Sequence, residues 1–302
     1  MPNGIILLDK PQGLTSNGAL QRIRKAFRAE SAGHVGTLDP MATGMLPVCL
    51  DEATKVIAEI EGGAKSYEFT LALGRRTDTG DAEGREIETQ HVPALTADKI
   101  EAALGEFTGI QKQVPPMYSA LKREGRPLYE LARQGVEVER AARTIEIRRF
   151  ELVAARPDAL DLVCDCAKGT YIRVLGEDLA RRLGTCGHLT RLRRTWVEPF
   201  RDMPMVSLEE ALAGCGEEPR PAWFLRPDAA LGHLEAVSFD AEGVTRLRHG
   251  QTAQGVAGSS GASPKGGIRA RLYDPRGEFL GLGEVLPDGR IQPRRLLRVP
   301  GA

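Results

Sequence analysis

Residues 33–44 read Gly33-His34-Val35-Gly36-Thr37-Leu38-Asp39-Pro40-Met41-Ala42-Thr43-Gly44, and they say more about this chain than any other stretch of it. Pro40 pushes the preceding residue, Asp39, toward extended backbone angles. The three glycines allow turns and the close approach of a large ligand. Such a loop holds one carboxylate in a fixed conformation and leaves space for a substrate beside it. An Asp-Pro turn between two elements is the alternative interpretation of the same residues.

Five further motifs accompany this loop, and each contains charged residues. In chain order they read Asp9-Lys10-Pro11-Gln12-Gly13-Leu14-Thr15-Ser16, Lys65-Ser66-Tyr67, Arg76-Thr77-Asp78-Thr79-Gly80-Asp81, Pro116-Met117-Tyr118-Ser119-Ala120-Leu121-Lys122 and Lys168-Gly169-Thr170-Tyr171-Ile172-Arg173. A single motif shared with a known protein family would be weak evidence of membership. Six matches in the same order are not accidental.

In this order the six motifs resemble those of the TruB family, the bacterial synthases that convert uridine 55 in the T-loop of tRNA to pseudouridine. The resemblance implies an α+β protein with the pseudouridine-synthase fold, a mixed, largely antiparallel central sheet flanked by helices and loops. It also implies a small C-terminal β domain, similar to the PUA RNA-binding module. An insertion at residues 115–143 would clamp the RNA. The partner would be tRNA, bound through its T-loop and T-arm.

The resemblance assigns catalysis to three residues. Asp39 would be the catalytic carboxylate, Arg173 its partner, and Tyr67 the ring that stacks on the target base. An ionised carboxylate can act as a nucleophile or a base, and a forked guanidinium offsets the rise in pKa that a closed pocket imposes on it. Without the resemblance, Arg173 reads as an exposed residue in the first turn of a helix, and Tyr67 as a core residue.

Five more residues are implied to contact the substrate. His34 would fill the gap that the extruded nucleotide leaves in the T-loop. Tyr171 and Leu192 would line the pocket, with Leu192 as an apolar wall. Lys10 and Lys122 would contact the RNA backbone, although lysines near a site are often only steering charges. A loop histidine such as His34 is otherwise usually a plain surface residue.

Length and composition bound the class of protein. At 302 residues the chain has room for one large or two medium domains. No apolar stretch reaches the roughly 18–20 residues that cross a membrane, and the N-terminus lacks a signal-peptide pattern, so we expect a cytoplasmic protein. The cysteines number five and lack paired spacing, which argues against disulfides and zinc. Isomerising uridine needs no redox step, so we expect no metal and no cofactor. Without a long heptad pattern we expect a monomer with no protein partner.

Charge is balanced overall, with 41 basic and 41 acidic residues. Affinity for nucleic acid depends on local neutralisation of phosphates, not on the total. The basic residues gather in three clusters, which are Arg22, Arg24, Lys25 and Arg28; Arg181, Arg182, Arg191, Arg193 and Arg194; and Arg290, Arg294, Arg295 and Arg298. We interpret them as a basic stripe for RNA, although each could be a solvated face.

Apolar patterns predict the elements of the first 230 residues. Strands are predicted at residues 5–8, 45–50, 67–73, 145–153, 160–167 and 189–197. Helices are predicted from about residue 16, at residues 52–60, 97–107, 128–134 and 172–183, and after residue 207. Thr15 or Ser16, Thr96 and Ser207 are the expected N-caps. Residues 77–88 are polar and glycine-bearing, and we expect a loop there.

A proline-rich connection at residues 219–227 is the expected domain boundary. It would separate a catalytic domain of residues 1–230 from a PUA-like domain of residues 235–302. In the second domain we expect strands at residues 268–273, 279–285 and 294–299. Residues 258–267 are rich in glycine and serine and are expected to form a flexible loop.

Two other functions compete with the synthase. One is a catalytically silent protein of the same fold that binds structured RNA or acts as a tRNA-folding chaperone. The retained Asp39, Tyr67 and Arg173 argue against it, since binding alone needs no buried carboxylate. The other is an unrelated hydrolase that pairs Asp39 with Asp78 or Asp81. It lacks a metal-ligand cluster or a histidine at motif spacing.

Overall fold

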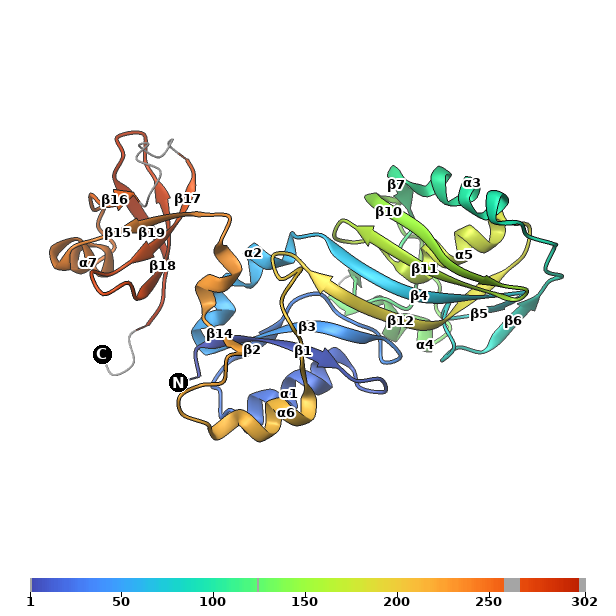
Figure 1. The fold of residues 1–302 in the computed structure, drawn as a ribbon, viewed down its shortest axis with the longest axis horizontal. Helices are drawn as coiled ribbons and strands as arrows, with labels where there is room; N and C mark the ends of the chain where they lie inside the picture. Colours follow the sequence, from blue (N-terminus) through green and yellow to red (C-terminus); the bar gives the residue numbers. More distant parts are fainter. Residues whose placement is uncertain (1, 124, 258–266, 299–302) are drawn as a thin grey trace.

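The computed structural model describes residues 2–123, 125–257 and 267–298 (Figure 1). A large sheet with helices fills most of the molecule, and a smaller sheet at the C-terminal end lies beside it (Figure 1). Of the loop expected at residues 258–267, all but Gly267 lies outside the described residues, as does the end of the strand expected at 294–299. No helix in the described ranges is long and apolar enough to cross a membrane.

The larger sheet contains ten strands within the described residues, in the order β13-β1-β3-β12-β4-β11-β10-β7, with β14 added to β1 and β2 to β3. Their bounds are β1 Gly4–Lys10, β2 Ala32–His34, β3 Thr43–Leu50, β4 Lys65–Leu73, β7 Gly109–Gln113, β10 Arg143–Arg156, β11 Ala159–Cys166, β12 Gly187–Val197, β13 Val206–Ser207 and β14 Phe224–Leu225. The pairs β1–β13 and β3–β12 are parallel and the other pairs are antiparallel. The expected mixed, largely antiparallel sheet is therefore confirmed.

Five helices form where the sequence predicts them. Their bounds are α1 Ser16–Ala26, α3 Ala97–Phe107, α4 Leu128–Arg133, α5 Ile172–Arg182 and α6 Leu208–Ala213. The side chains of Thr15, Thr96 and Ser207 accept hydrogen bonds from first-turn backbone N–H groups of α1, α3 and α6. Such caps contribute about 0.5–2 kcal/mol each. Apolar residues of α1, α3, α5 and α6 join one large core cluster with β4 and β11.

The sequence missed the short strands β2, β7, β13 and β14, and two further segments differ in type from the prediction. Residues 77–88 belong to a hairpin, because β5 Arg75–Thr77 pairs with β6 Glu86–Thr89. Its turn is closed by side chains, since Asp78 accepts from the N–H of Arg85 and Asp81 from that of Glu83. A hairpin closed in this way shows no apolar alternation. The helix expected at 52–60 is a 3₁₀ turn, η1 Asp51–Val56, followed by α2 Ile57–Glu61.

The proline-rich connection is packed against the larger sheet. Its residues Phe224 and Leu225 form β14 on the edge of β1. Phe27 of α1 stacks on Phe224 with ring centroids 5.5 Å apart, and Trp223 meets Phe27 edge-on at 6.4 Å. The segment then continues into a 3₁₀ turn, η3 Pro227–Leu231, in which Leu231 is buried. Aromatic residues among the prolines explain why this stretch packs and is not a free linker.

The smaller sheet has the order β16-β15-β17-β18-β19. Its strands are β15 Glu235–Ser238, β16 Val256–Ala257, β17 Arg269–Tyr273, β18 Phe279–Val285 and β19 Ile291–Leu296, joined by helix α7 Ala241–Arg248. The sequence predicted β17 and β18, placed the third strand three residues late, and missed α7, β15 and β16. Val237, Leu272 and Ile291 belong to a core of its own, whereas Phe279 and Leu282 share a cluster with residues of β1, β3 and η1.

Candidate active site

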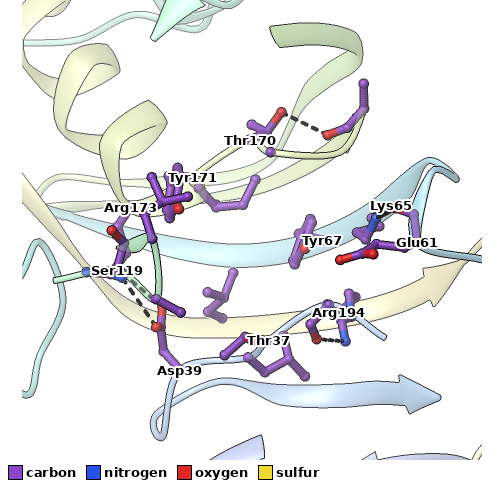
Figure 2. A pocket seen from close by; sticks show the side chains of 18 residues that line it. Thr37, Asp39, Glu61, Lys65, Tyr67, Ser119, Thr170, Tyr171, Arg173 and Arg194 are labelled. Carbon is purple, nitrogen blue, oxygen red and sulfur yellow. Dashed lines mark hydrogen bonds and ion pairs between the residues drawn. The ribbon is translucent and has the colours of Figure 1, made fainter. Parts of the chain in front are cut away.

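A cavity of about 340 Å³ opens between the loop of residues 33–44, strands β4 and β12, and the start of α5 (Figure 2). Residues Ser119, Ala120 and Leu121 of the expected RNA clamp complete its wall. Asp39 and Arg173 lie at one end of the cavity, Lys65 and Glu61 at the other, and Tyr67 lies between them (Figure 2). The size suits one nucleoside.

The loop that carries Asp39 is fastened to the motif of residues 9–16. Ser16 accepts the N–H of Leu38 at 2.8 Å and donates to its carbonyl oxygen at 3.0 Å. The N–H of Gly13 donates to the carbonyl of Pro40 at 2.8 Å. These bonds on both sides of Asp39 fix its backbone, so the two motifs act as one structural unit.

Lys10 belongs to the same unit, and the expectation that it contacts RNA backbone is wrong. Its side chain is fully buried. The ammonium donates to the carbonyls of Leu14, Pro11 and Pro40 at 2.7, 2.9 and 3.3 Å. A phosphate cannot reach a lysine that is enclosed by three backbone acceptors. Lys10 holds the Asp39 loop instead.

Arg173 is the ion-pair partner of Asp39, and its interpretation as an exposed residue is wrong. It is the second residue of α5, and its side chain is buried. Nε and Nη2 donate to the two carboxylate oxygens of Asp39 at 2.9 and 3.3 Å. The remaining donors are also engaged, with Nη1 bound to the carbonyl of Thr79 at 2.6 Å and Nη2 to that of Tyr118 at 2.7 Å. This fixed fork sets the orientation of the carboxylate.

Two opposing influences act on Asp39. Burial raises the pKa of its carboxyl group, while the adjacent Arg173 guanidinium lowers the pKa. Asp81 adds a second carboxylate, whose Oδ2 lies 3.7 Å from Nε of Arg173, and its charge raises the pKa of Asp39 further. Arg173 therefore favours the ionised carboxylate against the effect of burial, and an ionised carboxylate with little solvation is more reactive than an exposed one.

The middle of the cavity is apolar and aromatic. Tyr67 on β4 and Leu192 on β12 are buried residues of adjacent strands that both line it. Burial raises the pKa of the Tyr67 hydroxyl, so the phenol remains neutral. Tyr171 also lines the cavity, and its backbone exchanges two hydrogen bonds with the side chain of the buried Gln113, at 2.8 and 3.1 Å. These residues can sandwich a planar base.

Two expected contacts lie outside the cavity. His34 is half-buried on β2, and its Nδ1 has no hydrogen-bond partner among the described residues. Burial lowers the pKa of His34, which favours a neutral ring that can stack. Lys122 is exposed on β8 Lys122–Arg123, paired with β9 Arg126–Pro127 in the clamp. The structure brings neither next to Asp39.

The basic clusters are not one open stripe. Arg194, counted among them from sequence, is completely buried. Its neighbours on β12 are neutralised, since Arg191 pairs with Glu68 at 3.2 Å and Arg193 with Asp9 at 2.8 Å. Nearby carboxylates similarly meet Arg181, Arg182, Arg290 and Arg294. Much of the charge of the second and third clusters is therefore neutralised or buried, whereas Arg22, Arg24, Lys25 and Arg28 of the first cluster are exposed, and their binding of RNA stays a prediction.

Sequence reasoning missed four groups at the site. Asp81 shares Arg173 with Asp39, but of these two carboxylates Asp39 is the one that lines the cavity, and Asp78 binds the backbone of its own hairpin, so the paired-carboxylate hydrolase would lack its second aspartate in the cavity wall. The carbonyl of Tyr118 ties the clamp to Arg173. Lys65 and Arg194 line the cavity. The last two could have been found, because each lies two residues from a predicted pocket residue on the same strand face.

Comparison with known proteins gives concordant matches. The model described as TruB family pseudouridylate synthase (N terminal domain) matches residues 24–172. The model described as tRNA pseudouridylate synthase B C-terminal domain matches residues 173–220. A third, described as Pseudouridine synthase II TruB, C-terminal, matches residues 236–297.

Whole-length relatives agree with these matches. The chain is 48% identical to the tRNA pseudouridine synthase B of Aromatoleum aromaticum, over 98% of this chain and 92% of that protein. It is also 48% identical to that of Chromohalobacter salexigens, over 98% and 94%. Among solved structures, a Cbf5–Nop10–Gar1 complex superposes with a TM-score of 0.69 at 27% identity, covering 94% of this chain and 79% of the other.

The fold and the site therefore define an isomerase that converts uridine in RNA to pseudouridine. The chain belongs to the TruB family of pseudouridylate synthases.

Proposed function

We propose that this protein isomerises uridine 55 in the T-loop of tRNA to pseudouridine, with Asp39 as the catalytic carboxylate. One observation carries the proposal, namely the two-pronged ion pair of Asp39 and Arg173 at the end of a nucleoside-sized cavity. The relatives named as tRNA pseudouridine synthase B support the choice of tRNA. A tRNA substrate places the reaction in the cytoplasm, where we propose that the protein acts as a monomer.

The geometry assigns a task to each residue. The target uridine must leave its stack to reach the cavity. Tyr67 then stacks on the base, Tyr171 and Leu192 enclose it, and Asp39 faces the ribose. The C1′–N1 bond breaks with its electron pair going to the base, the base turns, and C5 bonds to C1′. C5 loses its proton and N1 gains one, so the composition of the nucleoside is unchanged.

Every role open to Asp39 needs its ionised form. A carboxylate can attack C1′, attack C6, or remove a proton from the ribose, and a protonated acid can do none of these. Arg173 serves all three by holding the carboxylate ionised and oriented. The geometry around Asp39 thus supports the reaction class independently of the order of bond changes.

The parts around the cavity would hold the RNA. We propose that the insertion at residues 115–143 clamps it, because Ser119 lines the cavity and the carbonyl of Tyr118 binds Arg173. Lys122, which lies in this insertion, would contact the RNA backbone. His34 would fill the gap that the extruded nucleotide leaves in the T-loop. We further propose a catalytic domain of residues 1–230 and a PUA-like RNA-binding domain of residues 235–302.

Release of tritium from tRNA labelled at C5 of its uridines tests the proposal, because only formation of the C5–C1′ bond expels that hydrogen. We expect release from a tRNA with uridine at position 55 and none from the same tRNA with cytidine there. Tight tRNA binding without release would instead support the catalytically silent RNA-binding protein. Release from other positions would confirm the synthase and refute the choice of uridine 55.

A further inference from the structure

Two cations at the far end of the cavity lack an anionic partner. Arg194 is fully buried, and its guanidinium donates to the carbonyls of Met45, Gly36 and Val35 at 2.7, 2.9 and 3.3 Å. Lys65 is only 7% exposed, and its ammonium donates to the carbonyl of Gly63 at 2.9 Å. In the part of the chain that the structure describes, neither side chain forms an ion pair with a carboxylate.

Arginines on the two faces of β12 differ in whether they have a carboxylate partner. On the face turned away from the cavity, Arg191 and Arg193 each have a carboxylate partner. Arg194 faces the cavity with Tyr67, its neighbour across the β4–β12 pair. Burying a charge without a partner is costly, and on the other face of the same strand the fold does supply a carboxylate to each arginine. We therefore look for an anion that enters the cavity from outside.

The opposite end of the cavity carries the opposite charge. There, Asp39 and Asp81 together share the single guanidinium of Arg173. Across the cavity from them lie Lys65 and Arg194, with the exposed Glu61 at the rim (Figure 2). Arg194 also lowers the pKa of both Lys65 and His34, second to burial, as expected where the potential is positive. The cavity is thus polarised from the ribose end to the base end.

We propose that Lys65 and Arg194 stabilise the negative charge that develops on the uracil ring when its bond to ribose breaks. The inference rests on the proposed function. Heterolysis of the C1′–N1 bond leaves its electron pair on N1, from which it spreads to O2 and O4 of the ring. C1′ meanwhile becomes electron-poor beside Asp39. A field directed along the cavity favours this separation, and oriented charges in a dry site cost no reorganisation during the reaction.

Leaving-group sensitivity separates this role from plain packing. Fluorine at C5 makes the departing uracil less basic, so its bond to ribose breaks with less help from nearby cations. We would measure single-turnover loss of the target nucleoside, by nuclease digestion and mass spectrometry, with uridine or 5-fluorouridine at position 55. The variants are Lys65→Met, Lys65→Arg and, as a surface control, Lys112→Met, in which the exposed wild-type ammonium binds the hydroxyl of Thr144.

We expect Lys65→Met to slow the reaction of uridine by roughly 100-fold, as for loss of a donor to a developing anion. The same change should slow 5-fluorouridine much less, tRNA affinity should stay within a few-fold, and Lys65→Arg should retain most of the rate. Lys112→Met should match the wild type. Equal losses on both nucleosides, or no loss, would overturn the inference while wild-type turnover upheld the proposed function. Absence of wild-type turnover would refute the function itself.

A second measurement does not depend on whether Lys65→Met folds. Burial, and then Arg194, lower the pKa of Lys65 to about 8. The other groups that face its ammonium are Cys166, Glu61 and Lys168, from β11, α2 and the loop after β11. Since the amine loses its charge as pH rises through that value, the wild-type rate should fall above about pH 8. Lys65→Arg should hold its rate to higher pH, and identical alkaline limbs would contradict the inference.

Discussion

Asp39 in the cavity and Asp161 on the surface of the sheet each meet an arginine through two hydrogen bonds. Arg173 reaches Asp39 at 2.9 and 3.3 Å, and Arg156 reaches Asp161 at 2.6 and 3.0 Å. The Arg173 side chain is 5% exposed and that of Arg156 is 49% exposed. Burial raises the pKa of Asp39, whereas the hydrogen bonds from Arg156 lower the pKa of Asp161.

The difference shows that a forked ion pair is not itself a site. Water solvates the Asp161 pair, so the pair adds little net stability and its carboxylate is merely hydrogen-bonded. In the cavity, the pairing with Arg173 must keep Asp39 ionised where solvent is scarce. It also leaves the Asp39 carboxylate facing the open space of the cavity. Reactivity comes from the surroundings, and each prediction below uses a change in the exposed Arg156–Asp161 pair as its control.

The largest effect is expected from Asp39→Asn. An amide can neither attack carbon nor accept a proton, and loss of a reacting group costs at least roughly 1,000-fold in turnover. Tritium release at saturating tRNA measures this. Binding should remain within a few-fold of wild type, because many phosphate contacts hold the RNA. Asp161→Asn should leave turnover unchanged. Activity of Asp39→Asn above a thousandth of wild type would remove Asp39 from the chemistry.

Arg173→Lys should produce the next largest loss. Lysine keeps the charge but cannot bind both oxygens of Asp39 together with the carbonyls of Thr79 and Tyr118. We expect kcat to fall by roughly 100-fold, similar to the removal of one oriented donor in other enzymes. The matched change Arg156→Lys should alter kcat by less than twofold. Equal kcat values for the two variants would show that the fork at Asp39 has no catalytic role.

Local signals explain what the sequence predicts well. Thr15, Thr96 and Ser207 cap helices through residues three or fewer positions away, so their role can be read without the fold. Arg173 and Asp39 lie 134 positions apart, and no periodicity links them. Their pairing followed only from resemblance to a family. The structure supplies the physical reason, which is that Arg173 in the first turn of α5 reaches Asp39 in the loop of residues 33–44.

Other features depend on strand irregularities that composition does not show. A bulge between Leu189 and Arg191 sets which residues of β12 face inward, and it places Leu192 and Arg194 toward the cavity. Once Leu192 is assigned to the cavity, alternation places Arg194 there too, but its charge and its basic neighbours suggested a surface residue. In the hairpin β5–β6 the turn is held by Asp78 and Asp81, so apolar alternation was absent. Sequence patterns thus fail to predict the position of charged residues whose side chains hydrogen-bond to the backbone inside the fold.

A smaller effect is expected in the pH dependence of turnover, which tests how burial and nearby charge act on Asp39. Because the pKa of Asp39 is raised and only its ionised form reacts, the rate should fall as pH drops through a value above the ordinary aspartate range. Asp81→Asn removes a charge that raises this pKa, so the acid limb should move to lower pH. The control Asp161→Asn should leave it in place. An unmoved limb in Asp81→Asn would show that another group controls the acid side.

The smallest effect is expected at an arginine that would serve only RNA binding. Arg294 on β19 is exposed and pairs with Glu284 at 2.7 Å, much as Arg156 pairs with Asp161. We expect Arg294→Gln to weaken tRNA binding a few-fold and leave kcat unchanged. If Arg294 neutralises one phosphate, the slope of log K against log salt should flatten by up to about 0.9. Arg156→Gln should change neither quantity.

Substitution is the better test here, because deleting the chain from residue 235 would also remove Phe279 and Leu282 from a cluster shared with the larger sheet. A truncated protein could lose binding simply by exposing that cluster. Replacing the single charge of Arg294 on β19 leaves the cluster intact, so a change in the slope of log K against log salt reports on phosphate contact alone. Identical slopes for Arg294→Gln and Arg156→Gln would place the RNA away from β19 and confine its contacts to the cavity and the clamp.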